Sequence, residues 1–247
     1  MSESYRGHFT GANAGAAYDQ DQYRPGSFWD VVWALEQPLL DRIVTDQRRR
    51  TPRIEYLDFA CGTGRVLAHV EGGVYTATGI DVSAAMLARA ATRVKRARLV
   101  QADLTAPGAP LEGRYDLITA FRFVLNAEPE LRVGALAALA ARLRDRESRL
   151  VVNTHGNPCS YKGVVVPIRR ALRAQGFEEK LLSAGELERL LAGVGLEVVE
   201  RHGMGVLPSP LWRRASRLAV LVEGRLTRVP LLWHLGVNQV LVCRRKS

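Results

Sequence analysis

The chain has 247 residues, of which 47% are apolar, and its formal net charge is +10. This length and composition allow one domain with a full hydrophobic core. No apolar run approaches the roughly 18 residues of a membrane-spanning helix, and the first residues lack the apolar stretch of a signal peptide. The three cysteines, an odd number without CxxC spacing, favour a reduced setting. We therefore expect a cytoplasmic protein.

The N-terminal region, residues 1 to about 45, begins with a Gly/Ala-rich stretch. It passes Tyr18 and Tyr23 and then becomes a helical stretch from Phe28 to Val44 that carries Trp29 and Trp33. One interpretation is a frayed tail followed by a helix that packs on the core of the protein.

A glycine-rich turn follows at residues 56–65, where an apolar run reaches Asp58 and then Gly62 and Gly64 lead into an amphipathic helix. Glycine lets the backbone approach a ligand closely, and the start of a helix offers free N–H groups. Seventeen residues after Gly64, a second apolar run ends at Asp81, where nucleotide-binding α/β units place a ribose-binding carboxylate. Leu67 stands where a dinucleotide site needs a third glycine. The pattern indicates an enzyme with a nucleotide cofactor other than a dinucleotide.

Strands and helices alternate through the rest of the chain, which predicts an α/β fold with a mostly parallel sheet and helices on both faces. Pro129 in a first turn and the capping box Ser183-Ala-Gly-Glu186 mark the starts of two helices. We expect helices near 65–71, 83–95, 130–146 and 184–194, and strands near 54–60, 75–81, 97–101, 115–121, 149–154, 196–202 and 238–244.

Five segments, in order and at matching spacing, resemble the motifs of class I S-adenosylmethionine (SAM) dependent methyltransferases. They are Asp58-Phe-Ala-Cys-Gly-Thr-Gly-Arg65, Gly79-Ile-Asp-Val-Ser83 with Met86, Gln101-Ala-Asp-Leu104, Tyr115-Asp-Leu-Ile-Thr-Ala-Phe121 and Arg149-Leu-Val-Val-Asn-Thr154. Ala60 departs from the family's glycine, which should narrow the loop slightly. The resemblance covers roughly residues 53–204 and implies a Rossmann-like seven-stranded sheet with its last strand antiparallel, and S-adenosyl-L-methionine as cofactor. We expect no metal, because the histidines are scattered without the spacing of metal ligands.

The resemblance also implies roles for the cofactor-binding residues. Backbone groups of Ala60, Gly62 and Gly64 should hold the methionine part, with Asp58 ordering the turn. Asp81 should accept both ribose hydroxyls. The remaining expected contacts are Asp103 to the adenine amino group, Met86 and Leu104 on the two faces of the ring, and the Phe121 backbone to the α-amino group.

The residues on the acceptor side follow from position, because Arg122, Asn126 and Asn157 come just after the fourth and fifth strands. Ligands bind at this carboxyl edge in such folds, so we expect these residues to bind substrate. His155 is the candidate general base, since histidine alone titrates near neutral pH unaided; a hydrogen-bonded loop residue is the equal alternative. Tyr18 and Tyr23 could close over the transfer site as catalytic residues, or could simply pack. In similar small-molecule methyltransferases the N-terminal segment is a lid, which is the second interpretation of residues 1–45.

The segment 205–236 is an insertion between the sixth and seventh strands. The stretch from Trp212 to Ser247, which includes the last strand, holds eight Lys/Arg and one acidic residue, Glu223. It therefore carries +7 of the chain's net charge. On a helical plot, Leu218, Val222 and Leu226 lie opposite the arginines, including Arg213, Arg214, Arg217 and Arg225. Such a stretch could meet an anionic membrane or an acidic substrate, or could cover the sheet with its arginines in solvent.

The expected organisation is a single methyltransferase domain, residues 1–247, with an N-terminal lid or helical segment (1–45), a cofactor-binding core (46–204), the insertion (205–236) and a final strand (237–247). The Arg122-to-Glu128 segment resembles stand-alone bacterial methyltransferases of natural-product and glycan pathways. We therefore expect methyl transfer to a small-molecule or lipid-linked acceptor. An RNA or protein methyltransferase using the basic region, and a non-catalytic SAM-binding module, stay open; the oligomeric state does too.

Overall fold

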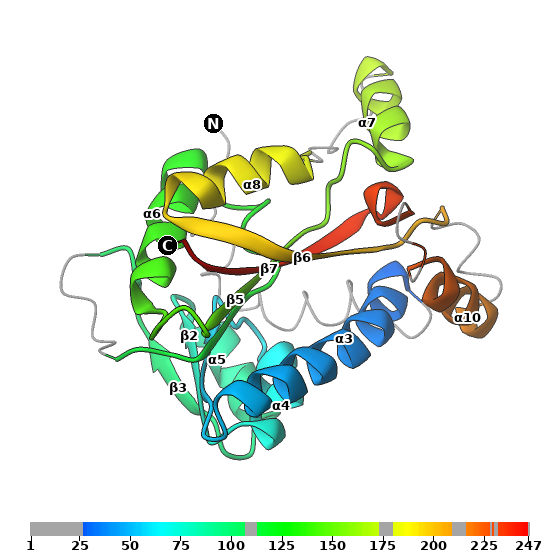
Figure 1. The fold of residues 1–247 in the computed structure, drawn as a ribbon. Coiled ribbons are helices and arrows are strands. Elements are labelled where there is room, and N and C mark those ends of the chain that lie inside the picture. The colour runs from blue at the N-terminus through cyan, green and yellow to red at the C-terminus, as the bar shows by residue number, and fades with distance from the viewer. Residues whose placement is uncertain are drawn as a thin grey trace.

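A seven-stranded sheet forms the centre of the protein in the computed structural model, which describes residues 27–106, 113–172, 180–208, 216–227, 229 and 232–246 (Figure 1). The strand order is β3-β2-β1-β4-β5-β7-β6. Strand β7 is antiparallel to both of its neighbours, while the pairs among β1 to β5 are parallel. The predicted fold class is confirmed. The strands are β1 (Glu55–Phe59), β2 (Thr76–Asp81), β3 (Arg98–Gln101), β4 (Leu117–Ala120), β5 (Arg149–Thr154), β6 (Leu196–Met204) and β7 (Asn238–Arg245).

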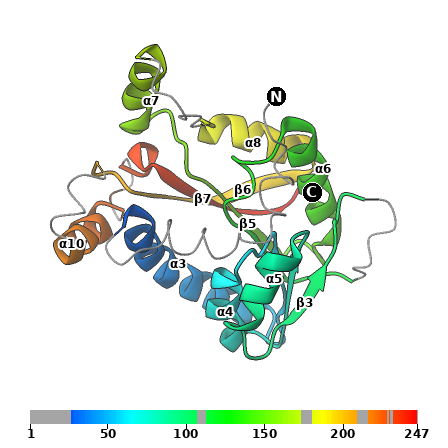
Figure 2. The same cartoon turned by 180° about the vertical axis from the view of Figure 1, so that it is seen from behind.

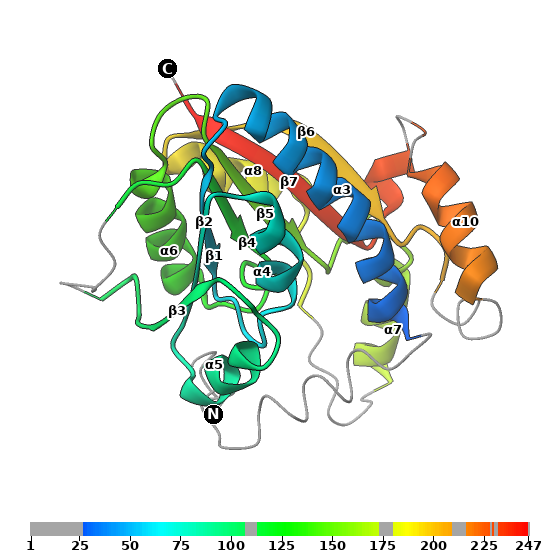
Figure 3. The ribbon, with the colours of Figure 1, turned by 90° about the horizontal axis from the view of Figure 1, so that it is seen from below.

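Helices cover both faces of this sheet, and Figure 3 shows α3 and α4 on one side and α6 and α8 on the other. Buried side chains of α6 and α8 share one apolar core with the sheet, and those of α3 and α4 share the second. The helices are α3 (Phe28–Arg50), α4 (Arg65–Val70), α5 (Ala84–Ala91), α6 (Pro129–Arg142), α7 (Lys162–Ala171), α8 (Ala184–Gly193) and α10 (Ser216–Leu226), with 3-10 turns η1 (Glu71–Gly73) and η2 (Leu232–Leu235).

Local signals in the sequence fix where several helices start. The hydroxyl of Ser83 accepts from the Met86 N–H at the start of α5, and Pro129 occupies the first turn of α6. The predicted capping box is present, with Ser183 and Glu186 each accepting from the other's backbone N–H. Side-chain acceptors of this kind satisfy N–H groups that have no partner within the helix.

Helix α3 extends beyond the predicted stretch and packs on the sheet. Its buried residues include Val32, Leu40 and Ile43, which join the core formed with β1 and α4. This arrangement agrees with the interpretation of a packed helix for residues 28–50. The lid assignment covers residues 1–45, of which residues 1–26 lie outside the described residues, and it stays a prediction.

Helix α10 buries an acidic residue and exposes part of its apolar face. Leu218 is 61% exposed, which does not fit the alternative of an apolar face that covers the sheet, whereas Glu223 is fully buried. The Glu223 carboxylate accepts from the backbone N–H groups of Gly205, Val206 and Leu207, after β6. An ionised carboxylate forms strong hydrogen bonds with such donors, so this contact decides the orientation of the helix. Residues 212–214 lie outside the described part of the chain.

Helix α7 was not predicted, because Gly163, Pro167 and three consecutive valines give it a low helix propensity. Figure 2 shows α7 and α10 at the same end of the molecule, where β5 and β6 finish. Within the described residues, no helix combines the length and the apolar character that crossing a bilayer requires.

Candidate cofactor-binding site

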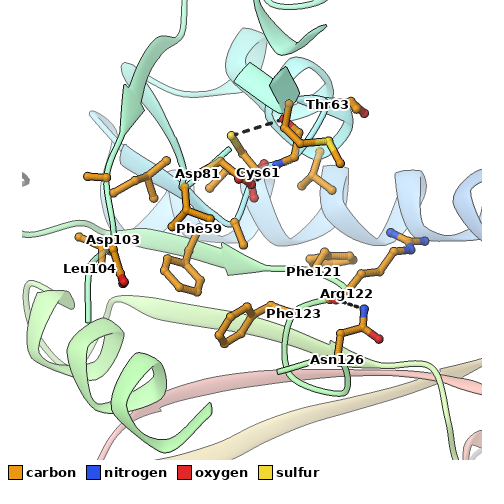
Figure 4. Close-up of a pocket in the computed structure, with 18 of the residues that line it drawn as sticks. Phe59, Cys61, Thr63, Asp81, Asp103, Leu104, Phe121, Arg122, Phe123 and Asn126 are labelled. Carbon is orange, nitrogen blue, oxygen red and sulfur yellow. Dashed lines mark hydrogen bonds between the residues drawn. The ribbon is translucent and has the colours of Figure 1, made fainter. Parts of the chain in front are cut away.

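A cavity lies at the carboxyl ends of β1, β2 and β4, where the chain switches direction across the sheet. Ligands of open α/β sheets bind at such a switch point. Figure 4 shows Asp103 and Leu104 on one side of the cavity and Arg122 and Asn126 on the other. The predicted residues that line it are Asp58, Ala60, Gly62, Asp81, Met86, Asp103, Leu104, Phe121, Arg122 and Asn126.

The glycine turn after β1 forms one wall of the cavity. Gly62 has a φ of 54° and Ala60, where the family has glycine, has a φ of 52°. This left-handed conformation is costly for alanine, by about 1–2 kcal/mol, and it turns the backbone toward the cavity. Gly64, which was also predicted to hold the methionine part, is not among the lining residues. Its φ is 76°, and a Cβ there would lie 2.9 Å from the Cβ of Ala90, so Gly64 lets α4 start close to α5.

Asp58 presents a buried carboxyl group to the cavity. Its Oδ1 accepts from the Thr119 hydroxyl at 2.7 Å, and that hydroxyl also contacts the Tyr56 hydroxyl. The other oxygen, Oδ2, is buried without a hydrogen bond among the described residues, although the Leu67 N–H is near enough to lower the pKa. Burial outweighs these donors and raises the pKa of Asp58 to about 7. A carboxyl group in this state fits a cationic ligand, since a positive charge would offset the cost of its burial.

Asp81 at the end of β2 connects the second motif to the glycine turn. Its Oδ2 accepts from the Gly62 N–H and its Oδ1 from the Ser83 N–H, each at 2.9 Å. Burial raises the pKa of Asp81, and these backbone donors partly counter that rise. A carboxylate offers about four lone-pair positions, so Asp81 retains capacity for two hydroxyl donors.

The wall beyond β3 brings Asp103, Leu104 and Met86 to the cavity. Asp103 Oδ1 accepts from the backbone N–H and the hydroxyl of Thr105, which orients its carboxylate. Leu104 and Met86 are both buried, as apolar side chains on either face of a planar ring would be. An acidic group beside two apolar surfaces fits an adenine that donates from its amino group.

Two of the residues predicted on the acceptor side, Asn157 and His155, lie outside the lining of the cavity. Asn157 is buried, and its amide donates to the carbonyls of His234 and Gly236 while accepting from the Cys159 N–H, so it connects two loops and cannot bind substrate. His155 is not among the lining residues. Its ring packs edge-on against Trp29, its Nδ1 has no hydrogen bond among the described residues, and burial lowers its pKa to about 3. Such a histidine is a weak base at neutral pH.

The described residues add lining groups that the sequence analysis missed. Phe59 and Phe123 meet edge to face, with 4.8 Å between ring centroids, and Thr63 and Arg65 lie in the glycine turn. Phe123 could have been recognised from its place within three residues of the end of β4. An apolar residue at that place is equally compatible with the hydrophobic core. Tyr18 and Tyr23 lie outside the described residues. Within the described chain, no group of three His, Cys, Asp or Glu side chains could hold a metal ion.

Comparison with known proteins agrees with this geometry. Residues 57–146 match the sequence model of a family described as Methyltransferase domain. No curated protein sequence matches the chain. Among solved structures, magnesium protoporphyrin IX methyltransferase from Synechocystis with bound S-adenosyl-L-homocysteine (SAH) is similar, at 15% identity and a TM-score of 0.66, covering 98% of each chain.

Two further structures share the fold. An amino pentose methyltransferase of calicheamicin biosynthesis from Micromonospora echinaspora has 16% identity and a TM-score of 0.56, covering 85% of this chain and 91% of its own. An N-methyltransferase from Bradyrhizobium japonicum with bound SAH has 14% identity and a TM-score of 0.54, covering 85% and 87%. Together, the family match assigns residues 57–146 to a methyltransferase domain, and the solved structures show that the chain shares the fold of SAM-dependent methyltransferases.

Proposed function

We propose that the protein transfers the methyl group of SAM to an oxygen, nitrogen or carbon atom of a small-molecule or lipid-linked acceptor of the natural-product or glycan type. The observation that carries the proposal is the cavity, which combines the buried, under-bonded carboxyl of Asp58 with Asp81 and Asp103. Two of the structural neighbours are named for small acceptors, a magnesium porphyrin and an amino pentose.

The chemistry needs little from the protein besides positioning. A lone pair of the acceptor forms a bond to the methyl carbon while the carbon–sulfur bond breaks, and the electron pair of that bond stays on sulfur to give SAH. Any proton on the attacking atom leaves to solvent or to a base. Holding acceptor and methyl group in line and excluding water accounts for much of the acceleration.

We assign cofactor contacts to the lining residues in their predicted roles. Asp81 accepts from the ribose hydroxyls, and Asp103 accepts from the adenine amino group between Met86 and Leu104. The Phe121 carbonyl and the turn at Ala60 and Gly62 hold the methionine part, whose positive charges the Asp58 carboxylate balances. The orphaned Asp58 oxygen and the lone-pair capacity of Asp81 support these assignments.

On the acceptor side, Arg122 and Asn126 remain the candidates, since both line the cavity. Their donors are partly committed, because the Asn126 amide donates to the Arg122 carbonyl at 2.6 Å and the Arg122 guanidinium donates to Glu36. Tyr18 and Tyr23 stay proposed contributors from the N-terminal segment. With the pKa of His155 near 3, we propose that a neutral acceptor loses its proton to water or to another group.

We further propose peripheral contact with an anionic membrane surface, which would suit a lipid-linked acceptor. The exposed side chains Val164, Ile168 and Leu172 follow one another at helical spacing along α7 and its end, and Leu218 and Leu221 are exposed on α10. Basic residues accompany them at Arg169, Arg170 and Arg225. Apolar side chains beside positive charge are the combination that binds an anionic lipid surface.

We also propose a cytoplasmic, reducing location. The three cysteines are unpaired, with Cys61 and Cys243 buried and Cys159 exposed. Burial raises the pKa of the Cys61 thiol well above its usual value, so this cysteine in the glycine turn is a packed thiol and a poor nucleophile.

Methyl transfer from SAM labelled in its methyl group, offered with fractionated small-molecule and lipid extracts, tests the proposed acceptor class. We expect label in a small organic or lipid product, and less of it with the Asp81→Ala variant. Label in RNA or protein, with affinity that falls steeply with salt, would favour the alternative of a macromolecular substrate. Binding of SAM without turnover on any fraction would favour a non-catalytic module.

A further inference from the structure

A buried polar network joins α3 to the turn after β4. At its centre is Glu36, in the middle of α3, which is 0% exposed. Its Oε2 accepts from the Arg122 guanidinium at 2.9 Å, and its Oε1 accepts from the amides of Asn153 at 3.3 Å and Asn238 at 3.0 Å. Asn153 also donates to Asn238 at 3.0 Å. The network thus connects α3, the β4 turn, β5 and β7.

The backbone of Arg122 is held in an unfavourable conformation by the same groups. Its φ is 56°, in the left-handed region that costs a non-glycine residue about 1–2 kcal/mol. The Arg122 N–H donates to Asn153 Oδ1 at 2.5 Å, and the Arg122 carbonyl accepts from the Asn126 amide at 2.6 Å. A strained turn persists only where its surroundings determine it, and here Asn153, Asn126 and Glu36 do so.

The Glu36–Arg122 pair neutralises the arginine. The Arg122 side chain is 10% exposed, and its guanidinium carbon lies 5.2 Å from the centre of the Trp29 ring, also on α3. A buried ion pair adds little net stability, because desolvation offsets its attraction, but each charge fixes the other's place. An arginine held in this way is poorly suited to recruit an anionic acceptor and well suited to hold α3 against the cavity wall.

We propose that Glu36 is a positioning residue for cofactor binding. Through Arg122 and Asn153 it fixes the Phe121–Arg122 turn, which lines the cavity, and so couples the seating of α3 to the affinity for SAM. The inference rests on the proposed function only in that Phe121 contacts the cofactor. Phe121 is directly followed by the strained residue, so a change in the φ angle of Arg122 also turns the peptide plane that holds the Phe121 carbonyl.

The test compares single and double variants by calorimetric titration with SAH and by thermal unfolding. Glu36→Gln leaves the guanidinium buried without its counter-charge, so we expect a lower Tm and SAH affinity reduced at least about tenfold. Arg122→Gln leaves the Glu36 carboxylate buried without its counter-charge, so we again expect a lower Tm and a reduced SAH affinity. In the double variant neither buried charge is left without a partner, so the Tm should recover toward that of the wild type. SAH affinity should stay reduced, because the turn has lost the ion pair that holds it.

Recovery of both Tm and affinity in the double variant would mean that the pair is only structural, and would overturn the proposal. Unchanged affinity in Glu36→Gln would overturn it as well. If Glu36→Gln does not fold, the double variant decides alone. Glu188→Gln is the matched control, since it breaks the Glu188–Arg201 pair between α8 and β6 and should leave SAH affinity unchanged. If the wild type itself does not bind SAH, the assigned cofactor is refuted. This outcome is distinct from a failure of the proposal for Glu36.

Discussion

Asp58 is a buried acid, and its surroundings disfavour its charged form. Its titration therefore predicts how the affinity for SAH depends on pH. Burial raises its pKa to about 7 in the folded protein, and a cation bound beside it would lower that pKa again. SAH, which keeps its positive α-amino group, should therefore bind the ionised form more tightly and release a proton. We expect SAH affinity to fall as pH drops below about 7, by up to about tenfold per pH unit.

Calorimetry from pH 5.5 to 8.5 measures this dependence, with Asp58→Asn as the comparison. The asparagine variant should bind SAH weakly at every pH and show no such slope. Because the folded pKa lies above the usual value of 3.8, the apo protein should also lose stability as pH rises from about 4 to about 7. An affinity that is flat with pH in the wild type would contradict the role of Asp58.

Single residues of the site were predictable where a strand end marked them. Asp58, Asp81 and Asp103 lie within two residues of the end of a strand, and the structure brings all three to one cavity. Glu36 was invisible, because it lies in the middle of a helix and acquires its partners only when β5 and β7 assemble beside α3. Asn157 was misassigned for the same reason, since its two carbonyl partners are almost 80 residues away along the chain.

At the scale of elements, the contact between α4 and α5 depends on Gly64. Gly64→Ala adds a Cβ that would lie 2.9 Å from Ala90 Cβ, at a φ of 76°. Left-handed strain and overpacking together should lower the free energy of unfolding by about 2–4 kcal/mol. Gly134→Ala in α6 is the control, since nothing lies within 4 Å of its added Cβ and the change should stabilise by about 0.5–1 kcal/mol.

Urea unfolding of the two variants distinguishes the contact from a general effect of alanine. Equal stability changes in Gly64→Ala and Gly134→Ala would contradict both the close packing of α4 on α5 at this point and the left-handed conformation of residue 64. A loss confined to Gly64→Ala, with weaker SAH binding, would link that packing to the shape of the glycine turn.

The helices and strands differ in how well their positions and orientations could be predicted from the sequence. Buried strands such as β4 and β5 each contain a short apolar run, Leu117-Ile118 and Leu150-Val151-Val152, and these strands were located directly. The orientation of helix α10 stayed open, because its apolar face could cover the sheet or meet another surface, and the contact of Glu223 with the loop after β6 could not be predicted. Hydrophobic periodicity alone cannot predict a contact between a buried carboxylate and the backbone of a distant loop.

For the whole molecule, the uneven distribution of charge along the chain predicts how strongly the protein binds to anionic surfaces. The stretch from Trp212 to Ser247 holds +7 of the net +10. Reversing Arg213, Arg214 and Arg217 to glutamate should reduce partition onto anionic vesicles, and the difference from wild type should grow as salt falls, because screening hides these charges at high ionic strength. SAH affinity should not change.

A variant with Arg89, Arg146 and Arg189 reversed is the control, since it carries the same change of net charge on exposed sites of the core. Vesicle sedimentation at low salt compares the two variants. Equal partition by wild type and the C-terminal variant would leave those arginines as a solvated surface and remove the proposed membrane contact.

Titration of the wild type and of Asp81→Ala with SAH tests the central claim, that this cavity binds SAM, most directly. We expect one SAH per chain, no comparable affinity for NAD, and a loss of about 2–4 kcal/mol in the variant, because two ribose hydroxyls lose their acceptor. Asp41→Ala, an exposed carboxylate on α3, should bind like wild type. Preference for NAD over SAH, or equal SAH affinity in the wild type and Asp81→Ala, would contradict the account.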